Sequence, residues 1–369
     1  MKNFLMKTVV CILKALYFPM KRFPKQDKIV FISRQSNSVP LDFKLIISVL
    51  GNAAPHKKIV VLPKKLEGNL FHKAGYGVHM IRQMYHIATA ELVVLDGYCI
   101  AASVLNHPEG TKIVQLWHAL GAVKKFGYQA LGTMEGSSPD VARIMKMHKN
   151  YDRVVCASWA TAQFFSEAFH TPLSKFRILG MPRVDYIQNT DNKNAEILRE
   201  YPYLNGKETI LYIPTFRKEH PIQTESLIAE MDHNRYNLIV KKHPLDTATI
   251  DEKFLLPKKY GTYDLLKFAD YIITDYSAAA IEASILNKPI FFYVYDYDYY
   301  QKSRGFNIDV FQEMPEMTSK NAGEIVQWIE AGDYNYGRLD CFREKYVETL
   351  DFCNTERITE ELLTLAKES

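Results

Sequence analysis

Two apolar segments in the second half of the chain lead directly into polar side chains that can bind phosphate. Residues 209–216 (TILYIPTF) contain Thr215 and are followed by Arg217, and residues 236–244 (YNLIVKKHP) contain His243 near their end. An arginine can hold a phosphate through two parallel hydrogen bonds, and a strand end can present an imidazole from a loop. The pattern indicates an anion site. Taken one at a time, Arg217 can also be an ordinary surface arginine and His243 a loop histidine without a function.

A third segment of this half ends an apolar run at Asp275 and Ser277 (residues 271–277, YIITDYS). We expect Ser277 at a helix N-cap and a helix from Ala278 onward, whose first N–H groups can bind phosphate. Glu282 lies one turn further along, where a carboxylate can accept hydrogen bonds from the two hydroxyls of a ribose. A plain serine cap with a solvated glutamate is the alternative, but three polar strand ends in one half favour a common binding edge.

In the first half of the chain, a titratable side chain stands at the end of another apolar run. Residues 112–118 (KIVQLWH) end at His118, and Lys124 and Lys125 follow a turn that contains glycine. An imidazole has an ordinary pKa of about 6.5, so at neutral pH it can take a proton from an attacking hydroxyl. We therefore predict that His118 is a general base facing a cleft between the halves. Lys124 and Lys125 are predicted to contact the acceptor or a phosphate.

The elements that must position these residues alternate between short apolar runs and longer helical patterns, which is typical of βα units around parallel sheets. Ligands of such sheets bind at the carboxyl ends of the strands. The polar stretch 189–196 separates two such series, so we expect two α/β halves joined near residue 190. The predicted strands are residues 28–33, 58–63, 91–97, 112–118, 153–158, 175–180, 209–216, 236–244, 271–277 and 289–296, and helical spacing covers residues 39–52, 158–170, 262–269 and 278–287.

Length and composition exclude several classes of protein. The chain has 369 residues, more than one hydrophobic core usually holds, so two domains are expected. It is 47% apolar and 12% aromatic, which excludes a wholly disordered chain, and a net charge of +4 is too small to indicate nucleic-acid binding. The five cysteines are scattered without a C-x-x-C pair, so we expect neither a disulfide framework nor a zinc knuckle, and a reducing cytoplasm fits.

The N-terminal segment, residues 1–27, combines an apolar run with basic residues. Lys7 and Lys14 interrupt its apolar part, residues 4–18, which is shorter than the roughly 20 residues that cross a bilayer, so we expect that it does not span a membrane. Basic residues follow it instead of a small-residue cleavage site, which disfavours a signal peptide. We expect a basic amphipathic helix in an anionic membrane interface; a helix packed on the first domain is the alternative.

Several ordered motifs between about residues 28 and 350 resemble the CDP-glycerol glycerophosphotransferase family of teichoic-acid primases and polymerases. They are QLWHALGAVKKFG, YIPTFR, KKHP, ITDYSAAAIEA and RGFNID. The resemblance implies an α/β fold of the GT-B type, with two Rossmann-like domains facing across a cleft, in a peripheral protein at the cytoplasmic face of the cell membrane. It implies CDP-glycerol, or a similar CDP-alditol, as donor, with CMP released. The implied acceptor is an undecaprenyl-linked saccharide or poly(glycerol phosphate), and no cofactor, metal or nucleic acid is expected.

The resemblance also assigns roles to the positions that match the family's motifs. His118 matches the histidine of W-H-G, the base, and His243 matches the histidine of K-x-H-P, a second catalytic residue suited to the donor phosphates. Many members read W-H-G-T-P-L-K where this chain reads WHALGAVKK, so contacts to the acceptor beside His118 can differ, and Ala278 replaces the second serine of D-Y-S-S. The residues expected to bind the donor are Arg217, Thr215, Asp275, Ser277, Ala278, Glu282 and Arg304.

The expected organisation is a membrane-associating segment (residues 1–27), an acceptor domain (residues 28–190) and a CDP-alditol-binding domain (residues 191–369). The expected activity is the transfer of glycerol phosphate to a hydroxyl of a prenyl-linked acceptor in teichoic-acid or capsular polymer synthesis, by one addition or many. A CDP-ribitol ribitolphosphotransferase, a GT-B glycosyltransferase using a nucleotide sugar and a non-catalytic membrane-bound scaffold stay open as alternatives. Asp296 and Asp298 form a D-x-D pattern, which we interpret as a strand end over the donor pocket rather than as a metal site.

Overall fold

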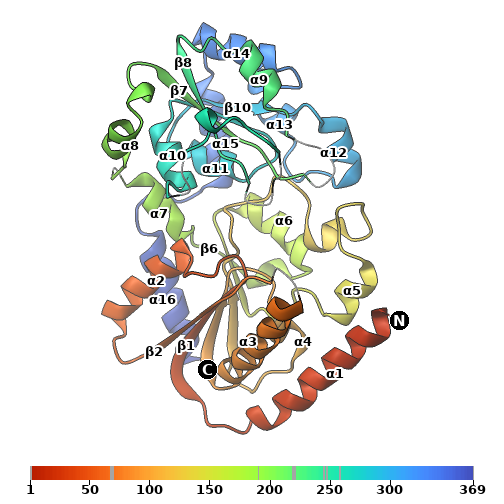
Figure 1. The fold of residues 1–369 in the computed structure, drawn as a ribbon. Helices are drawn as coiled ribbons and strands as arrows, with labels where there is room; N and C mark the ends of the chain where they lie inside the picture. Colours follow the sequence, from red (N-terminus) through yellow and green to blue (C-terminus); the bar gives the residue numbers. More distant parts are fainter. Residues whose placement is uncertain are drawn as a thin grey trace. The chain divides into compact units, whose positions relative to one another are not determined.

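The chain forms two compact units, each built on one parallel sheet (Figure 1). The computed structural model describes residues 2–66, 70–189, 191–217, 222–243, 246, 248–256 and 259–368. Unit 1 comprises residues 1–120, 125–185 and 348–369, and unit 2 comprises residues 121–124 and 186–347. The end of the chain thus belongs to unit 1, whereas we expected it in the second domain.

The sheet of unit 1 has six parallel strands in the order β2-β1-β3-β4-β5-β6. The strand order reverses between β1 and β3, and in open parallel sheets such a reversal opens a crevice at the carboxyl ends of the strands. The strands are β1 (Gln26–Ser33), β2 (Lys58–Pro63), β3 (Ala90–Leu95), β4 (Lys112–Gln115), β5 (Arg153–Cys156) and β6 (Phe176–Ile178).

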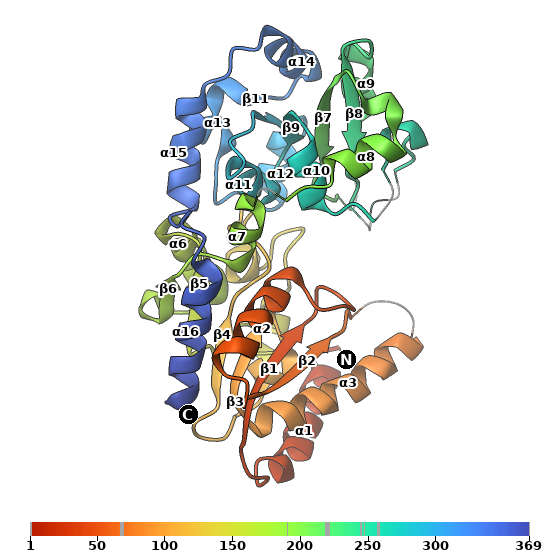
Figure 2. The ribbon, with the colours of Figure 1, turned by 90° about the vertical axis from the view of Figure 1, so that its left-hand side faces the viewer.

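Helices connect these strands, and the last helix of the chain returns to the same sheet. This helix, α16 (Asn354–Lys367), packs against α2, β3 and β4 (Figure 2). The other helices of the unit are α1 (Lys2–Met20), α2 (Leu41–Ala53), α3 (Leu70–Ala88), α4 (Ile100–Val104), α5 (Pro139–Ile144), α6 (Trp159–Phe169) and α7 (Pro182–Gln188), whose last turn belongs to unit 2.

The sheet of unit 2 has five parallel strands in the order β11-β10-β9-β7-β8, so its strand order also reverses, between β7 and β9. The strands are β7 (Glu208–Ile213), β8 (Tyr236–Val240), β9 (Tyr271–Thr274), β10 (Ile290–Tyr293) and β11 (Thr318–Ser319). The helices are α8 (Asn194–Glu200), α9 (Glu225–Glu230), α10 (Thr262–Phe268), α11 (Ala279–Ser284), α12 (Tyr297–Ser303), α13 (Val310–Glu313), α14 (Ala322–Ala331) and α15 (Tyr336–Tyr346).

The predicted α/β class with parallel sheets is confirmed, and every predicted strand is present. Several strands end earlier than predicted, and the polar residues at their predicted ends lie in the loops that follow. The apolar runs predicted these strands correctly because the residues of the strands are buried one after another. In β1 the residues from Ile29 to Ile32 are at most 1% exposed. A parallel sheet covered on both faces buries successive side chains instead of alternate ones. Strand β11, with two residues, was not predicted.

Helix α1 packs on unit 1 through one apolar face and exposes another. Val10, Leu13 and Tyr17 are buried, and the Tyr17 hydroxyl lies 2.9 Å from Nδ1 of His107. The helix contacts α3 and α5. By length and composition alone, Asn3–Met20 could cross a membrane. The apolar helix is therefore longer than the segment 4–18 that we considered too short. The large apolar side chains that α1 exposes are Phe4, Leu5, Val9, Ile12, Leu16 and Phe18.

Candidate active site

The carboxyl edge of the unit 2 sheet carries the predicted donor-binding residues. Thr215 and Arg217 follow β7, Asp275 and Ser277 follow β9, and His243 follows β8. The first two pairs therefore flank the reversal of strand order between β7 and β9, which is where open parallel sheets bind their ligands. The structure thus brings together, at one sheet edge, residues that lie up to about sixty positions apart in sequence.

Arg217 is buried in this edge and binds two carboxylates. Its Nε and Nη2 donate to Oδ2 and Oδ1 of Asp296 at 2.6 and 3.0 Å, and its Nη1 donates to Oδ2 of Asp275 at 2.9 Å and to the carbonyl of Thr215 at 2.7 Å. Burial opposes the charge, but the two carboxylates together raise the pKa of Arg217 above its ordinary value. A guanidinium has five N–H donors, and these contacts with described residues use four. One Nη2 hydrogen is not used by these contacts. The contact of Arg217 with a phosphate stays a prediction.

The carboxylates around Arg217 tie three strand ends together. Asp275 is fully buried and also accepts from the backbone N–H of Thr215, at 3.0 and 2.9 Å, and of Tyr276, at 2.6 Å. Asp296 accepts from the Tyr276 hydroxyl at 3.1 Å. The ends of β7, β9 and β10 are therefore fixed to one another by charge-assisted hydrogen bonds, which are stronger than neutral ones. The aromatic rings within 6 Å of the guanidinium carbon are those of Tyr276, Tyr295 and Tyr300.

The two aspartates of the D-x-D pattern take different partners. Asp296 binds Arg217, whereas Asp298 pairs with Lys320 at 2.6 Å on the surface. Across the described residues, no group of three or more His, Cys, Asp or Glu side chains is arranged to hold a metal ion. The pattern therefore marks one buried and one exposed ion pair.

The start of α11 differs from the prediction by one residue. The N-cap is Ala278, with φ −62° and ψ −13°, and the helix begins at Ala279, so the prediction of Ser277 as N-cap was wrong. A turn separates β9 from α11, and in it the Ser277 hydroxyl still accepts from the N–H of Ala279 at 3.3 Å. Glu282 is 7% exposed and accepts from the hydroxyl of Tyr263 at 2.9 Å. Its predicted contact with a ribose stays a prediction.

His243 and Arg304, the other two predicted donor-side residues, also lie in unit 2. His243 is exposed, and its ring stacks on Phe216 with centroids 5.2 Å apart. Arg304 is half-buried at the end of α12, where its N–H donates to the carbonyl of Tyr300 at 3.0 Å. Gly305 follows with φ +80°, a conformation that favours glycine. This conformation explains why the RGFNID motif has a glycine at position 305. The roles of His243 and Arg304 stay predictions.

Lys124 and Lys125, predicted as a pair, belong to different units. Lys124 lies in the short segment assigned to unit 2, forms an antiparallel bridge with Phe306, and places its Nζ 5.9 Å from the centre of the Tyr300 ring. The carbonyl of Val123 beside it accepts from two backbone N–H groups of the 305–308 turn. Lys125 is half-buried in unit 1. Residues 121–124 are thus built into unit 2, while the acceptor role of both lysines stays a prediction.

His118 lies just past β4 in unit 1, where its ring is held by one hydrogen bond. Nδ1 lies 2.9 Å from the carbonyl oxygen of Asp96. A carbonyl can only accept, so Nδ1 carries the hydrogen and Nε2 is the proton acceptor of the ring. Burial lowers the pKa of His118 to about 4, although the Asp96 carbonyl opposes this shift. His118 is therefore neutral at pH 7, as a general base requires, with a pKa well below the ordinary value assumed from the sequence.

The residue directly before His118 lies in a strained turn. Trp117 has φ +64°, which is rare for a bulky residue. The side-chain amide of Gln115 accepts from the N–H of Trp117 at 2.9 Å and donates to the Gly97 carbonyl at 3.1 Å and to the Tyr151 hydroxyl at 2.8 Å. Such strain persists where neighbouring contacts over-determine it. The rings around the indole are those of Phe126, Phe165, Phe169, His148 and His118.

Three charged residues near His118 were not predicted from the sequence. Asp96 is 4% exposed, and burial raises the pKa of its carboxyl to about 6. Arg183 donates to the backbone carbonyl of His118 at 2.8 Å, and it pairs with Asp42. Asp96 lies near the end of the predicted strand 91–97, and Arg183 follows the predicted strand 175–180, so the strand-end pattern that indicated the other residues could have identified both. Asp42 stands inside a helical segment and carries no such signal.

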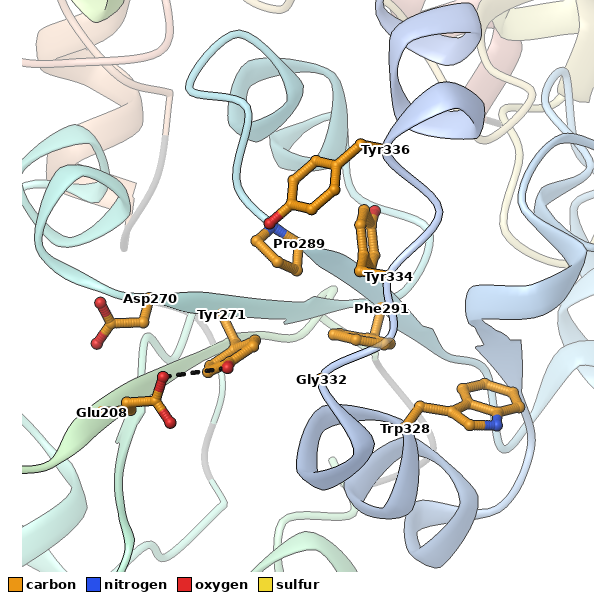
Figure 3. A pocket seen from close by; sticks show the side chains of 9 residues that line it. All are labelled: Glu208, Asp270, Tyr271, Pro289, Phe291, Trp328, Gly332, Tyr334 and Tyr336. Atoms are coloured by element: carbon orange, nitrogen blue, oxygen red, sulfur yellow. Dashed lines mark hydrogen bonds between the residues drawn. The ribbon is translucent and has the colours of Figure 1, made fainter.

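A cavity of about 180 Å³ lies in unit 2 at the opposite edge of the sheet (Figure 3). Glu208 and Tyr271 are the first residues of β7 and β9, and the Tyr271 hydroxyl donates to Glu208 at 3.1 Å. The cavity is thus at the amino ends of the strands, separate from the carboxyl edge. Its lining residues are Glu208, Asp270, Tyr271, Pro289, Phe291, Trp328, Gly332, Tyr334 and Tyr336, and none of them is a predicted site residue.

Residues 15–364 match the family model described as CDP-glycerol:poly(glycerophosphate) glycerophosphotransferase. The match covers both sheets. Among curated proteins, the chain is 30% identical to a teichoic acid ribitol-phosphate primase of Bacillus spizizenii, over 98% of this chain and 97% of that protein. It is 32% identical to a teichoic acid glycerol-phosphate primase of Bacillus subtilis, over 73% of this chain and 72% of that protein.

Solved structures share the fold at lower sequence identity. A variant of the wall teichoic acid polymerase TagF soaked with CDPG aligns with a TM-score of 0.75 and 20% identity, over 100% of this chain and 97% of that chain. A UDP-GlcNAc 2-epimerase from Neisseria meningitidis aligns with a TM-score of 0.58 and 13% identity, over 91% of this chain and 100% of that chain. At these identities the likeness establishes the fold.

Proposed function

The chain belongs to the CDP-glycerol:poly(glycerophosphate) glycerophosphotransferase family, and from this premise we propose that it transfers glycerol phosphate from CDP-glycerol to a hydroxyl of a prenyl-linked acceptor, releasing CMP. The observation that carries the proposal is the family match over residues 15–364, which includes both the anion edge of unit 2 and His118 of unit 1. The product belongs to the synthesis of a teichoic acid or a related cell-surface polymer.

In the proposed reaction, the acceptor hydroxyl oxygen attacks the β-phosphorus of the donor. The bond between this phosphorus and the bridging oxygen breaks, CMP leaves with that oxygen, and the hydroxyl proton moves to Nε2 of His118. The neutral imidazole with hydrogen on Nδ1 supports this role, because it leaves Nε2 as the proton acceptor.

The donor is proposed to bind at the carboxyl edge of unit 2. His243, Ser277 and the remaining Nη2 hydrogen of Arg217 stabilise the charge that develops on the phosphate oxygens as CMP leaves, an electrostatic role that is large in phosphoryl transfer. Glu282 accepts from the ribose hydroxyls, and Arg304 binds a donor phosphate. The ion pairs of Arg217 support a second role for this residue, which is to hold the strand ends that carry the other groups.

Ribitol phosphate is a second candidate for the transferred group. It is favoured by the similarity to a ribitol-phosphate primase along nearly the whole length of both chains, whereas the similarity to a glycerol-phosphate primase covers about three quarters of each. Both of these relatives are primases, which supports one or a few additions per acceptor.

We expect purified protein to release CMP when it is given CDP-glycerol and a short prenyl-linked saccharide acceptor, and to extend that acceptor by a small number of units. The measurement uses radiolabelled CDP-glycerol and CDP-ribitol in parallel and sizes the lipid products. Faster turnover of CDP-ribitol would move the assignment to ribitol. Release of UDP from a UDP-sugar, or donor binding without turnover on any acceptor, would contradict the proposal.

We also propose that α1 attaches the protein to the cytoplasmic face of the cell membrane as a peripheral protein. Its outward apolar side chains, among them Leu5, Val9 and Ile12, are exposed, and residues 1–26 contain lysine and arginine but no acidic residue. This combination favours an anionic lipid surface. The buried contacts of the other face of α1 favour a helix lying on the membrane over one that crosses it.

Replacing Ile12 with glutamate should weaken binding to vesicles that contain an anionic phospholipid by about 10- to 100-fold, because an isoleucine side chain contributes about 1.5–3 kcal/mol when it leaves water. Asn52→Glu adds the same charge at an exposed site on α2 and should have little effect. Co-sedimentation with vesicles measures both variants. Equal binding by wild type and Ile12→Glu would rule out α1 as the attachment site.

A further inference from the structure

Two charged residues from distant parts of unit 1 form a buried ion pair beside His118. Asp42 lies in the first turn of α2 and Arg183 in the first turn of α7, and Asp42 is 4% exposed. The Nε of Arg183 donates to Oδ1 and Oδ2 of Asp42 at 3.3 and 3.1 Å, its Nη2 donates to Oδ2, and its backbone N–H donates to Oδ1 at 2.9 Å. A carboxylate bonded in this way fixes the plane of the guanidinium.

The fixed guanidinium reaches the backbone of His118. Its Nη1 donates to the carbonyl oxygen of His118 at 2.8 Å, and the ring of the same residue is bonded to the Asp96 carbonyl at 2.9 Å. A Cβ atom at Gly97 would be in tight contact with Nε2 of Gln35, at 3.1 Å, and in ordinary van der Waals contact with Nδ1 of His118, at 3.9 Å. His118 is therefore held at its backbone by one element and at its ring by another, next to the strained turn at Trp117.

We propose that Arg183 and Asp42 are positioning residues for the general base. Asp42 fixes Arg183, Arg183 holds the His118 carbonyl, and the ring then keeps its hydrogen on Nδ1 and presents Nε2 to the acceptor hydroxyl. The inference rests on the proposed role of His118. We call the ion pair of Arg183 and Asp42, with its hydrogen bond to the His118 carbonyl, the clamp. Without the clamp, the left-handed conformation of Trp117 loses one of its supports and the His118 ring moves. A displacement of about 1 Å can lower a rate about 100-fold.

A plain structural tie between α2 and α7 is the alternative role for the same ion pair. The two roles differ in their effect on the imidazole, which is surrounded by Asp96, Arg183, Asp42 and His148. The charge of Arg183 lowers the pKa of His118, and the charge of Asp42 raises it. Removing the charge of Arg183 should therefore raise this pKa, and removing the charge of Asp42 should lower it. A general loosening of the fold would shift the pKa in the same direction in both variants.

The test is an NMR titration of the full chain labelled with ¹⁵N-histidine, with the His118 signals assigned by their absence in His118→Ala. In wild type we expect hydrogen on Nδ1 and a pKa near 4. Arg183→Met should raise the His118 pKa, and Asp42→Asn should lower it. In the labelled-donor assay, both variants should lose about 100-fold in kcat with little change in KM for the donor, because the proposed donor groups belong to unit 2.

Two further variants keep the test decisive. Asp185→Asn lies two residues after Arg183 on α7 and removes a carboxylate that accepts from Asn354 and Thr355; it should lower stability but leave the tautomer and pKa of His118 unchanged. Arg183→Lys keeps the charge if Arg183→Met fails to fold, and should keep the wild-type tautomer while lowering kcat.

Shifts of the same sign in Arg183→Met and Asp42→Asn would overturn the positioning role, as would wild-type kcat in both variants when His118→Ala has lost turnover. The NMR readout by itself does not depend on the proposed function. If His118→Ala keeps full turnover while the opposite shifts are seen, the role of His118 as base fails and the clamp on its ring stands.

Discussion

Turnover will fall by about 100- to 10,000-fold when His118 is replaced by alanine, while the affinity for CDP-glycerol stays nearly unchanged. The imidazole accepts the proton of the attacking hydroxyl, and general-base catalysis contributes rate factors of this size. The donor groups proposed here belong to a different unit, so their contacts do not depend on the His118 side chain. CMP release measures turnover, and equilibrium titration with CDP-glycerol measures binding.

His56→Ala is the matched control for this prediction. The His56 side chain is 68% exposed in the same unit, and its removal should leave both turnover and binding at wild-type levels. Wild-type turnover by His118→Ala would remove His118 from the role of base. A parallel loss of donor affinity would show instead that the variant disturbs the protein more widely.

Arg217→Met will destabilise unit 2 by about 3–5 kcal/mol, which is the usual cost of removing one partner from a buried ion pair. Arg217 is 7% exposed, and its guanidinium neutralises two carboxylates, of which Asp275 is fully buried. Its loss leaves Asp275 and Asp296 as close, desolvated negative charges at the ends of β9 and β10. Hydrogen exchange of the amides of β7, β9 and β10 measures the free energy of opening for this unit by itself.

Arg235→Met removes an exposed arginine from the same unit and should change stability by less than about 0.5 kcal/mol. If Arg217→Met has wild-type stability but binds CDP-glycerol weakly, Arg217 acts through donor phosphate and not through the ion pairs. If stability falls and the double variant with Asp296→Asn recovers part of it, the network account is supported, because one of the two uncompensated charges is gone.

The sequence was informative about where the sheets are and which residues stand at their edges. Parallel strands that are covered on both faces need continuous apolar runs, so the runs themselves located β1 to β10. A polar residue directly after such a run lies at the carboxyl edge, and this reasoning placed Arg217, Asp275 and His118 correctly at strand ends. It extended several strands too far, since the loop residues that follow a strand are also partly buried and apolar.

The partners of these residues could not be predicted, because they lie far away in sequence. Arg217 binds Asp296, 79 positions later, and Arg183 binds Asp42, 141 positions earlier. Residue spacing carries no information about pairs of this kind until strand order and register are known. For the same reason, we expected the end of the chain in the second domain, whereas α16 packs on the sheet of unit 1.

The backbone conformation near His118 could not be predicted from the sequence either. The sequence QLWH predicts a strand up to the histidine, but the ladder ends at Gln115 and Trp117 adopts a positive φ. Nothing in the residue types signals this turn, since tryptophan disfavours the conformation and Gln115 supports it through a side-chain amide. The lowered pKa of His118 follows from the desolvation of this half-buried ring and was likewise not predicted.

The central claim is that a neutral imidazole with a lowered pKa, that of His118, takes the proton of the acceptor hydroxyl, and the pH dependence of kcat/KM tests it most directly. Burial disfavours the charged ring, so the base stays competent as the pH falls through 6.5, and activity declines only as the pH approaches about 4. We predict nearly constant kcat/KM between pH 8 and pH 5. A midpoint near 6.5, with a loss of about 30-fold at pH 5, would contradict it, because that is the behaviour of an unperturbed histidine.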